Sequence, residues 1–218
     1  MSKSTIHPDA IWGVREIAGT SEELLSKLDE KELYLPVINR IKLEKRKREW
    51  LAVRILLKEL LGEEKEVEYD ASGKPFFKDN SYHISISHTA GYVAVILNPE
   101  HPVGIDIEQI TNQVERIRDR FLTEEENIHI SKENELIHLL LHWSAKETVF
   151  KALGNSNVTF NEQLHIRTFS PKIGLLETFS AYETRTKQKK EFIVSYIVNS
   201  EYVLTFTELI NINDETED

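Results

Sequence analysis

The chain of 218 residues contains no cysteine. It therefore cannot form a disulfide bond, a thiolate metal site or a cysteine nucleophile, and any metal ion must be held by oxygen or imidazole. Long apolar runs are also missing, since none approaches the roughly 20 residues needed to cross a bilayer. The first ten residues, MSKSTIHPDA, lack the charged-then-apolar pattern of a secretory signal. We therefore expect a cytoplasmic protein without membrane contact.

Basic residues are scarce as well, with 27 Lys and Arg against 37 Asp and Glu and a net charge of -10. This balance argues against nucleic-acid binding by the chain as a whole. The exception is the segment 40–62, RIKLEKRKREWLAVRILLKELLG, whose spacing predicts a helix that ends at Gly62. Its basic first half has two interpretations: a solvated helix flank, or a surface for a phosphorylated ligand.

The apolar content of 40% suffices for one sizeable core or two lobes of about 100 residues each. Capping boxes predict helices that begin after Thr20 and Thr123, and residues 133–153 predict a long helix. Alternating and β-branched patterns predict strands in the remaining segments: 11–17, 66–70, 83–88, 92–98, 103–110, 164–169, 175–183, 191–198 and 202–209. Because the strands and helices come in blocks, the order favours an α+β fold.

Two carboxylates share one face of the expected strand VGIDIE. Side chains alternate along a strand, so Asp106 and Glu108 lie on the same side, about 6.6 to 7 Å apart. Gly104 has the same parity and is expected to leave that face open to a ligand. The alternative is the polar outer face of a sheet, which needs no ligand.

A third carboxylate, Glu147, lies in the segment WSAKETVFKALG. It interrupts an apolar helical stripe formed by Leu136, Leu140, Trp143 and Phe150. An unpaired acid in such a stripe costs several kcal/mol unless it binds a cation or a partner. A divalent ion shared with Asp106 and Glu108 resolves this cost, and Mg²⁺ prefers oxygen ligands of this kind. The alternative is an ordinary helical pair with Lys151, four residues further on.

VGIDIE followed by WSAKETVFK resembles the paired signature of the 4'-phosphopantetheinyl transferases, enzymes that load carrier proteins. GKPFF at 73–77, ISISHT at 84–89 and RFLTEEE at 120–126 resemble further segments of the family, in the same order. The resemblance implies two similar α+β lobes related by pseudo-twofold symmetry. It divides the chain into an N-terminal lobe (1–104), a C-terminal lobe (105–210) and an acidic tail (211–218).

The family transfers the 4'-phosphopantetheine arm of coenzyme A to a serine of an apo acyl or peptidyl carrier protein and releases adenosine 3',5'-bisphosphate. By resemblance, Asp106, Glu108 and Glu147 would bind magnesium. Glu147, or a water it orients, would accept the serine proton, and Lys151 would steady the phosphoryl group. The expected contacts with coenzyme A phosphates involve Lys74, His88, Lys146 and one or more of Arg46, Arg48 and Arg54.

Some of these residues also have simpler interpretations. Lys74, beside Pro75, could be an exposed turn residue, and His88 could be a core histidine because it shares strand parity with Ile84 and Ile86. Two rival functions remain open. One is a metal-dependent phosphohydrolase, and the other is a non-enzymatic module that binds nucleotide or RNA.

We expect the carrier protein to dock near residues 110–130, where three arginines (Arg116, Arg118 and Arg120) lie close to two apolar residues, Phe121 and Leu122. Carrier proteins of this kind are generally acidic, which suits a basic and partly apolar surface. We expect a monomer. The sequence does not discriminate between fatty-acid, polyketide and nonribosomal peptide carriers.

Overall fold

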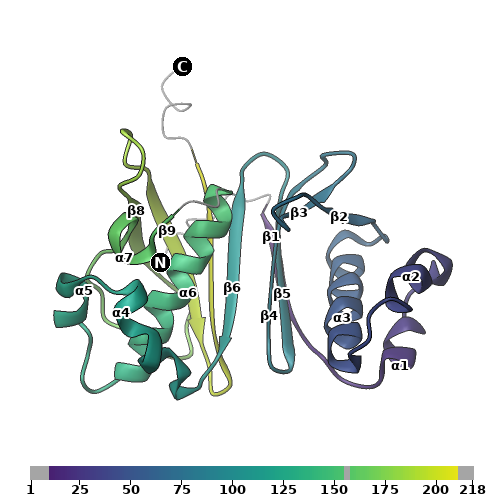
Figure 1. Ribbon diagram of the computed structural model, residues 1–218, viewed down its shortest axis with the longest axis horizontal. Helices are drawn as coiled ribbons and strands as arrows, with labels where there is room; N and C mark the ends of the chain where they lie inside the picture. Colours follow the sequence, from purple (N-terminus) through teal and green to yellow (C-terminus); the bar gives the residue numbers. More distant parts are fainter. Residues whose placement is uncertain (1–9, 155–157, 211–218) are drawn as a thin grey trace.

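The computed structural model describes residues 10–154 and 158–210, which form helices and antiparallel strands (Figure 1). The first half contains β1 (Ile11–Glu16), α1 (Ser21–Leu25), α2 (Lys31–Ile38), α3 (Glu44–Leu61), β2 (Val67–Tyr69), β3 (Pro75–Phe77), β4 (His83–Thr89) and β5 (Tyr92–Asn98). The second half contains β6 (Val103–Gln109), the 3-10 helix η1 (Asn112–Ile117), α4 (Arg118–Phe121), α5 (Glu124–Ile128), α6 (Glu135–Leu153), α7 (Phe160–Gln163), β7 (Leu164–Ile166), β8 (Glu177–Glu183), β9 (Glu191–Val198) and β10 (Tyr202–Glu208). The α+β class is confirmed. The expected acidic tail lies outside the described residues.

The two larger sheets share the same strand connectivity at one edge. Their strand orders are β1-β5-β4 and β6-β10-β9-β8-β7, with antiparallel neighbours throughout. In each sheet the first strand pairs with the last, and the last pairs with the strand before it. The long helices α3 and α6 occupy the same place in this order (Figure 1). The repeated topology agrees with two similar lobes, while the division at residue 104 stays a prediction.

An apolar cluster between the two sheets joins the halves. Ile96 on β5, Ile105 on β6 and Phe206 on β10 belong to it and are fully buried. At the adjoining edge, Ser85 and Ser87 of β4 accept hydrogen bonds from backbone amides of β6 at 3.2 and 3.3 Å. The strand that carries the predicted acids is therefore fixed to both lobes.

Helix α6 packs unusually close to β6. A Cβ atom at Gly104 would lie 1.9 Å from the carbonyl oxygen of Thr148 and 3.0 Å from the amide nitrogen of Ala152. The prediction that Gly104 leaves room for a ligand is therefore wrong, because the helix backbone fills that space. Buried hydroxyls also join α6 to the neighbouring strand β10, with the Oγ1 atoms of Thr148 and Thr205 2.7 Å apart.

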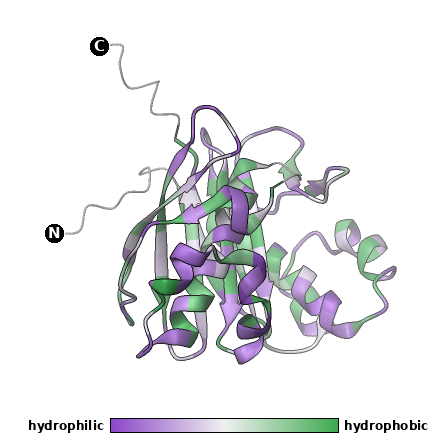
Figure 2. Ribbon diagram, turned by 60° about the vertical axis from the view of Figure 1, so that its left-hand side comes forward, coloured by the Kyte–Doolittle hydropathy of each residue, from purple (hydrophilic) through white to green (hydrophobic). Residues whose placement is uncertain are grey.

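Helix α3 ends as predicted. Gly62 adopts a left-handed conformation with φ of 75°, which a residue without a Cβ tolerates well. The predicted apolar face is buried in the core of the first half (Leu51, Ile55 and Leu56). In Figure 2 the helical ribbons carry both hydrophilic and hydrophobic segments, as expected of helices with one face on a core. In the part of the chain that the structure describes, no helix is both long and apolar enough to span a bilayer.

Candidate active site

Asp106 is the most enclosed of the three predicted acids, with 4% of its surface exposed. Its Oδ1 atom accepts hydrogen bonds from the hydroxyl of Ser87 and the ammonium of Lys151, each at 2.8 Å. Its Oδ2 atom is buried and has no hydrogen-bond partner. A buried carboxylate oxygen without a partner is costly, so this atom suits a cation or an incoming donor.

Glu108 lies two residues further along β6 and is half-buried. The indole N–H of Trp143 donates a hydrogen bond to its Oε1 atom at 2.6 Å. Burial, followed by the charge of Asp106, raises the pKa of Glu108 to about 7, although the bond from Trp143 acts in the opposite direction. The carboxyl group of Glu108 therefore gains and loses its proton near neutral pH.

Glu147 faces the same acids from α6. Burial, and then the charge of Asp106, raises the pKa of Glu147 to about 7, while Lys151 opposes the shift. The alternative of a Glu147–Lys151 ion pair is wrong, because the ion pair of Lys151 is with Asp106.

The predicted apolar stripe needs a correction as well. Leu140 is buried, but Leu136, Trp143 and Phe150 are only half-buried. The helix buries other positions more fully, such as Leu139 and Val149. Glu147 therefore lies on the partly open face of α6, where a ligand can approach, and not within a continuous core stripe.

The donor set fits a hard divalent cation in its chemistry. Three carboxylates interact electrostatically, and Asp106 contributes an oxygen without a partner. Among residues 10–154 and 158–210, however, no three acidic or imidazole side chains are gathered closely enough to enclose a metal ion. The magnesium assignment therefore stays a prediction.

A cavity of about 230 Å³ extends from Lys151 to the β2–β3 turn. Its lining includes Ser85, Ile86, Phe150 and Gly154. Lys74 also lines it, and its Nζ atom lies 2.7 Å from where a Cβ of Gly154 would be. Lys74 therefore reaches the end of α6 from the other half of the chain and is not simply an exposed turn residue. The two lysines give the cavity positive charge on both sides.

Only one of the three predicted arginines meets His88. The Nη1 atom of Arg46 lies 3.2 Å from His88 Nε2. Arg48 instead donates to the carbonyl oxygen of Ile17, and Arg54 is 4% exposed beneath the ring of Trp50. Arg54 is thus too enclosed for the predicted phosphate contact, and that assignment is corrected.

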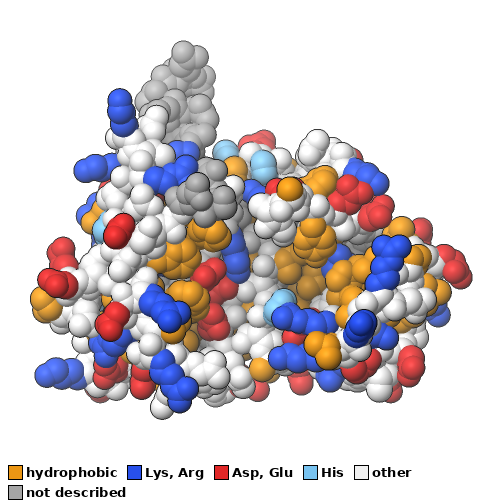
Figure 3. All heavy atoms as spheres, in the orientation of Figure 1, with side chains coloured by type: hydrophobic (Ala, Val, Ile, Leu, Met, Phe, Trp, Pro, Cys, Tyr) orange, Lys and Arg blue, Asp and Glu red, His pale blue; other side chains and the backbone are white. Residues whose placement is uncertain are grey.

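His88 itself is exposed, so its interpretation as a core histidine is wrong. Figure 3 shows a histidine and basic side chains on the α3 side of the central hollow, opposite acidic side chains on the α6 side. The site therefore combines a cationic wall with an acidic wall.

Lys146 is the clearest correction among the predicted coenzyme contacts. It is fully buried, and its ammonium pairs with Glu126 at 2.7 Å. Two residues of the predicted docking surface are also buried, since Phe121 is 0% and Leu122 6% exposed. Neither the lysine nor these two apolar residues can contact a ligand in this conformation.

The sequence did not predict two hydrogen-bond partners of the acids, Ser87 for Asp106 and Trp143 for Glu108. Ser87 lies on β4 in the segment ISISH. Because side chains alternate along a strand, the sequence does indicate that Ser87 lies on the opposite face from Ile86. Trp143 precedes Glu147 by four residues, so the two share one helix face. Neither signal identifies which acid the side chain would contact.

Comparison with known proteins relates the segment that carries these acids to a family. Residues 102–207 match the model of the 4'-phosphopantetheinyl transferase superfamily. This segment, which carries all three acids, is therefore similar to the 4'-phosphopantetheinyl transferase superfamily.

Individual relatives are named as phosphopantetheinyl transferases. The chain is 35% identical over 85 residues to the 4'-phosphopantetheinyl transferase gsp of Aneurinibacillus migulanus, covering 38% of this chain and 35% of the relative. It is 31% identical over 122 residues to the transferase AcpT of Salmonella typhi, covering 51% and 61%. It is 27% identical over 128 residues to the L-aminoadipate-semialdehyde dehydrogenase-phosphopantetheinyl transferase of Xenopus laevis, covering 48% and 42%. The chain thus spans between about a third and three fifths of the length of these relatives.

Proposed function

We propose that the protein transfers the 4'-phosphopantetheine arm of coenzyme A to a serine of an apo acyl or peptidyl carrier protein. One observation carries the proposal, namely the surroundings of Asp106. One of its carboxylate oxygens is buried without a partner, and the other accepts a hydrogen bond from Lys151, which lines the cavity. Two glutamates whose pKa values are raised to about 7 lie beside it. The family match over the same residues supports it.

In the proposed reaction the serine Oγ atom forms a bond to the β-phosphorus of coenzyme A. The bond from that phosphorus to the bridging oxygen breaks, and the oxygen leaves with adenosine 3',5'-bisphosphate. The serine proton passes to Glu147, directly or through a water. A carboxylate whose pKa is about 7 is well suited to accept a proton at neutral pH.

Lys151 would steady the transferring phosphoryl group. Its contact with Asp106 Oδ1 at 2.8 Å and its place in the cavity lining support this role. On the opposite wall, Lys74, Arg46 and His88 would contact the other phosphates of coenzyme A. Lysine and arginine in a partly enclosed site provide the charge that a diphosphate requires.

We further propose that Asp106, Glu108 and Glu147 hold Mg²⁺. The unpartnered Oδ2 atom of Asp106 supports this assignment. When bound, the ion would neutralise the diphosphate and the charge that develops on the leaving oxygen. The cytoplasmic location, the monomeric state and the lack of nucleic-acid binding stay predictions.

The test is an incubation with coenzyme A, Mg²⁺ and an apo-carrier protein, followed by intact mass spectrometry and nucleotide chromatography. Transfer predicts a phosphopantetheine mass increase on the carrier and one adenosine 3',5'-bisphosphate per modified serine. Release of inorganic phosphate would favour the phosphohydrolase alternative. Binding of coenzyme A without turnover would favour a non-enzymatic module. An Asp106→Asn variant, which keeps the side-chain shape, is the control for background modification.

A further inference from the structure

The strands β4 and β6 are joined by side-chain hydroxyls where their edges meet. Strand β4 is the last strand of one sheet, and β6 is the first of the other. Three hydroxyls at alternate positions of β4 accept hydrogen bonds from backbone amides at alternate positions of β6: Ser85 from Ile105 at 3.2 Å, Ser87 from Ile107 at 3.3 Å and Thr89 from Gln109 at 3.1 Å. Alternate residues of a strand share one side, so these hydroxyls form a row that faces β6.

In this row, Ser87 is the residue whose hydroxyl reaches Asp106. It donates a hydrogen bond to the Oδ1 atom of Asp106 at 2.8 Å while it accepts one from the amide of Ile107. A hydroxyl has one donor and two acceptor lone pairs, so both bonds form at once. Because the Ile107 amide belongs to the β6 backbone, it holds the Ser87 oxygen in place and leaves the hydroxyl hydrogen directed at Asp106.

The carboxylate of Asp106 is held through its Oδ1 atom. Ser87 and Lys151 both donate to this oxygen at 2.8 Å, and they approach it from β4 and from α6. Lys151 is itself held by the carbonyl oxygen of Ile105 at 2.9 Å. If the two donors bonded to different oxygens of Asp106, both oxygens would be satisfied. The observed arrangement instead leaves Oδ2 buried without a partner, which costs free energy and calls for an explanation.

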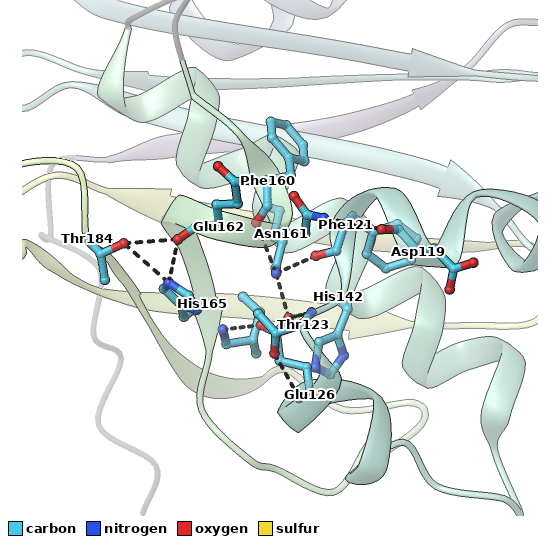
Figure 4. A network of polar contacts seen from close by, with 12 residues as sticks. Asp119, Phe121, Thr123, Glu126, His142, Phe160, Asn161, Glu162, His165 and Thr184 are labelled. Carbon is cyan, nitrogen blue, oxygen red and sulfur yellow. Dashed lines mark hydrogen bonds and ion pairs between the residues drawn. The ribbon is translucent and has the colours of Figure 1, made fainter.

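The other lysine of the motif, Lys146, does not share in this arrangement. Its side chain is 0% exposed, and its ammonium donates to Glu126 at 2.7 Å and to the carbonyl oxygen of Phe121 at 2.6 Å. Figure 4 shows Glu126 and Phe121 in the network of polar contacts around this ammonium. The orientation of Asp106 therefore depends on the two donors to its Oδ1 atom.

We propose that Ser87 is a positioning residue: its hydroxyl, held by the Ile107 amide, fixes the carboxylate of Asp106 so that Oδ2 stays available to the ligand of the site. This inference rests on the proposed transfer function for the identity of that ligand, a divalent cation bound with the diphosphate of coenzyme A. Ser87 connects the two walls of the site, because β4 also carries His88. Residues that orient a metal-binding carboxylate typically change metal affinity or activity by about tenfold to a hundredfold when they are replaced.

The main test compares Ser87→Ala with Thr89→Val. Thr89→Val removes a hydroxyl-to-amide bond of the same row, from Gln109, and leaves both donors to Asp106 in place, so it is the matched control. Isothermal titration of Mg²⁺ in the presence of coenzyme A should give a Kd about tenfold higher or more in Ser87→Ala and within about twofold of the parent in Thr89→Val. The kcat of carrier modification should fall in parallel. The KM for the carrier protein should not change, since Ser87 is only 7% exposed.

Two further readouts separate positioning from packing. Ser87→Thr should restore the parental Kd and kcat, because Thr89 shows that a threonine in this row makes the same bond to β6. Crystal structures of the metal-free variants provide a readout that is independent of activity. The carboxylate plane of Asp106 should turn by more than about 20° in Ser87→Ala and keep its parental orientation in Ser87→Thr and Thr89→Val.

An unchanged orientation of Asp106 in Ser87→Ala would overturn the inference, as would an unchanged Kd for Mg²⁺ or an equal loss in Thr89→Val. If Ser87→Ala does not fold, Ser87→Cys keeps a side chain of similar shape that is only a weak donor, and it is scored by the same criteria. A parent protein that neither binds Mg²⁺ nor modifies the carrier would contradict the proposed function, whereas the orientation of Asp106 in the metal-free crystals tests the positioning by itself.

Discussion

The indole N–H of Trp143 donates a hydrogen bond of 2.6 Å to Oε1 of Glu108, which ties α6 to β6 at the acidic site. The bond stabilises the ionised form of Glu108 and so opposes the upward shift of its pKa. It also fixes the orientation of one carboxylate oxygen. In the proposed Mg²⁺ site, where Glu108 would be a ligand, Trp143 would orient that ligand, and residues in this position often matter nearly as much as the ligands themselves.

Replacing this tryptophan should therefore affect Glu108 first. In Trp143→Phe the pKa of Glu108 should rise above its present value of about 7, because a bond to the charged form is lost. Carbon-13 NMR of labelled glutamate in the presence of a chelator measures this directly. Transfer should fall by roughly tenfold to a hundredfold. Trp12→Phe, in the interface between the sheets, is the control, and an unshifted Glu108 titration would contradict the prediction.

Glu147 should make the metal-free protein less stable as the pH rises. Its pKa is about 7 in the folded state against an ordinary value of 4.5, so the folded protein holds the proton more tightly. Its stabilising contribution is complete below about pH 4.5 and is lost as the pH rises through about 7. The melting temperature of Glu147→Gln, minus that of the parent, should increase across this window in chelator.

The comparison must be made between variants because buried histidines act in the opposite direction. Burial lowers the pKa of His138 to about 4 and that of His142 to about 3, so their contribution is lost as the pH falls. Both histidines are present in the parent and in Glu147→Gln, so their contribution cancels in the difference. A difference in melting temperature that is constant with pH would refute the assignment for Glu147.

Gly104 should tolerate no side chain. A methyl group there would overlap the carbonyl oxygen of Thr148, which belongs to the α6 backbone and cannot rotate away. Gly104→Ala should cost about 3 kcal/mol in the free energy of unfolding and reduce transfer by displacing α6 from β6. Gly13→Ala is the matched control, because its Cβ would meet only the side-chain ends of Leu56 and Leu60. Urea denaturation should show a clearly smaller loss for the control; equal losses would argue against the close contact.

Arg46 should recognise the 3'-phosphate of coenzyme A, because it is the arginine of the basic helix that meets His88. Arg46→Gln should weaken coenzyme A binding, and weaken dephospho-coenzyme A binding much less. Isothermal titration at two salt concentrations measures both effects, since the charge-dependent part is screened by salt. Lys45→Gln, whose side chain is 73% exposed on the same helix, is the control. Equal losses for the two ligands would remove Arg46 from the phosphate site.

Much of the local structure could be predicted because its signals lie within a few residues. Thr20 with Glu23, and Thr123 with Glu126, form the capping boxes that their spacing indicates. The alternation of β6 likewise places Asp106 on the side of Glu108, toward α6. Helix α2 had no comparable signal, since Pro36 within it is a residue that usually interrupts helices.

The errors concern contacts made across the fold. Lys146 and Glu147 are adjacent in one motif, which suggests a shared role. The helix nevertheless directs Lys146 toward Glu126 and Glu147 toward Asp106. Gly104 was predicted to leave space for a ligand, because the sequence does not show that α6 packs against this residue. Partners such as Ser87 for Asp106 are set by the register between β4 and β6, which no local pattern specifies.

Glu147 provides the most direct test of the account, because its carboxylate is proposed to serve chemistry at some cost to the fold. The decisive measurement is the initial rate of carrier modification by Glu147→Leu, with its melting temperature in chelator as the check on folding. We predict a rate at least about a hundredfold below that of the parent. The metal-free protein should be unchanged in stability or more stable by about 1 kcal/mol, since a poorly solvated acid is removed. Mg²⁺ with coenzyme A should stabilise the parent but not this variant. A Glu147→Leu protein that modifies the carrier at the parental rate would contradict the proposed site.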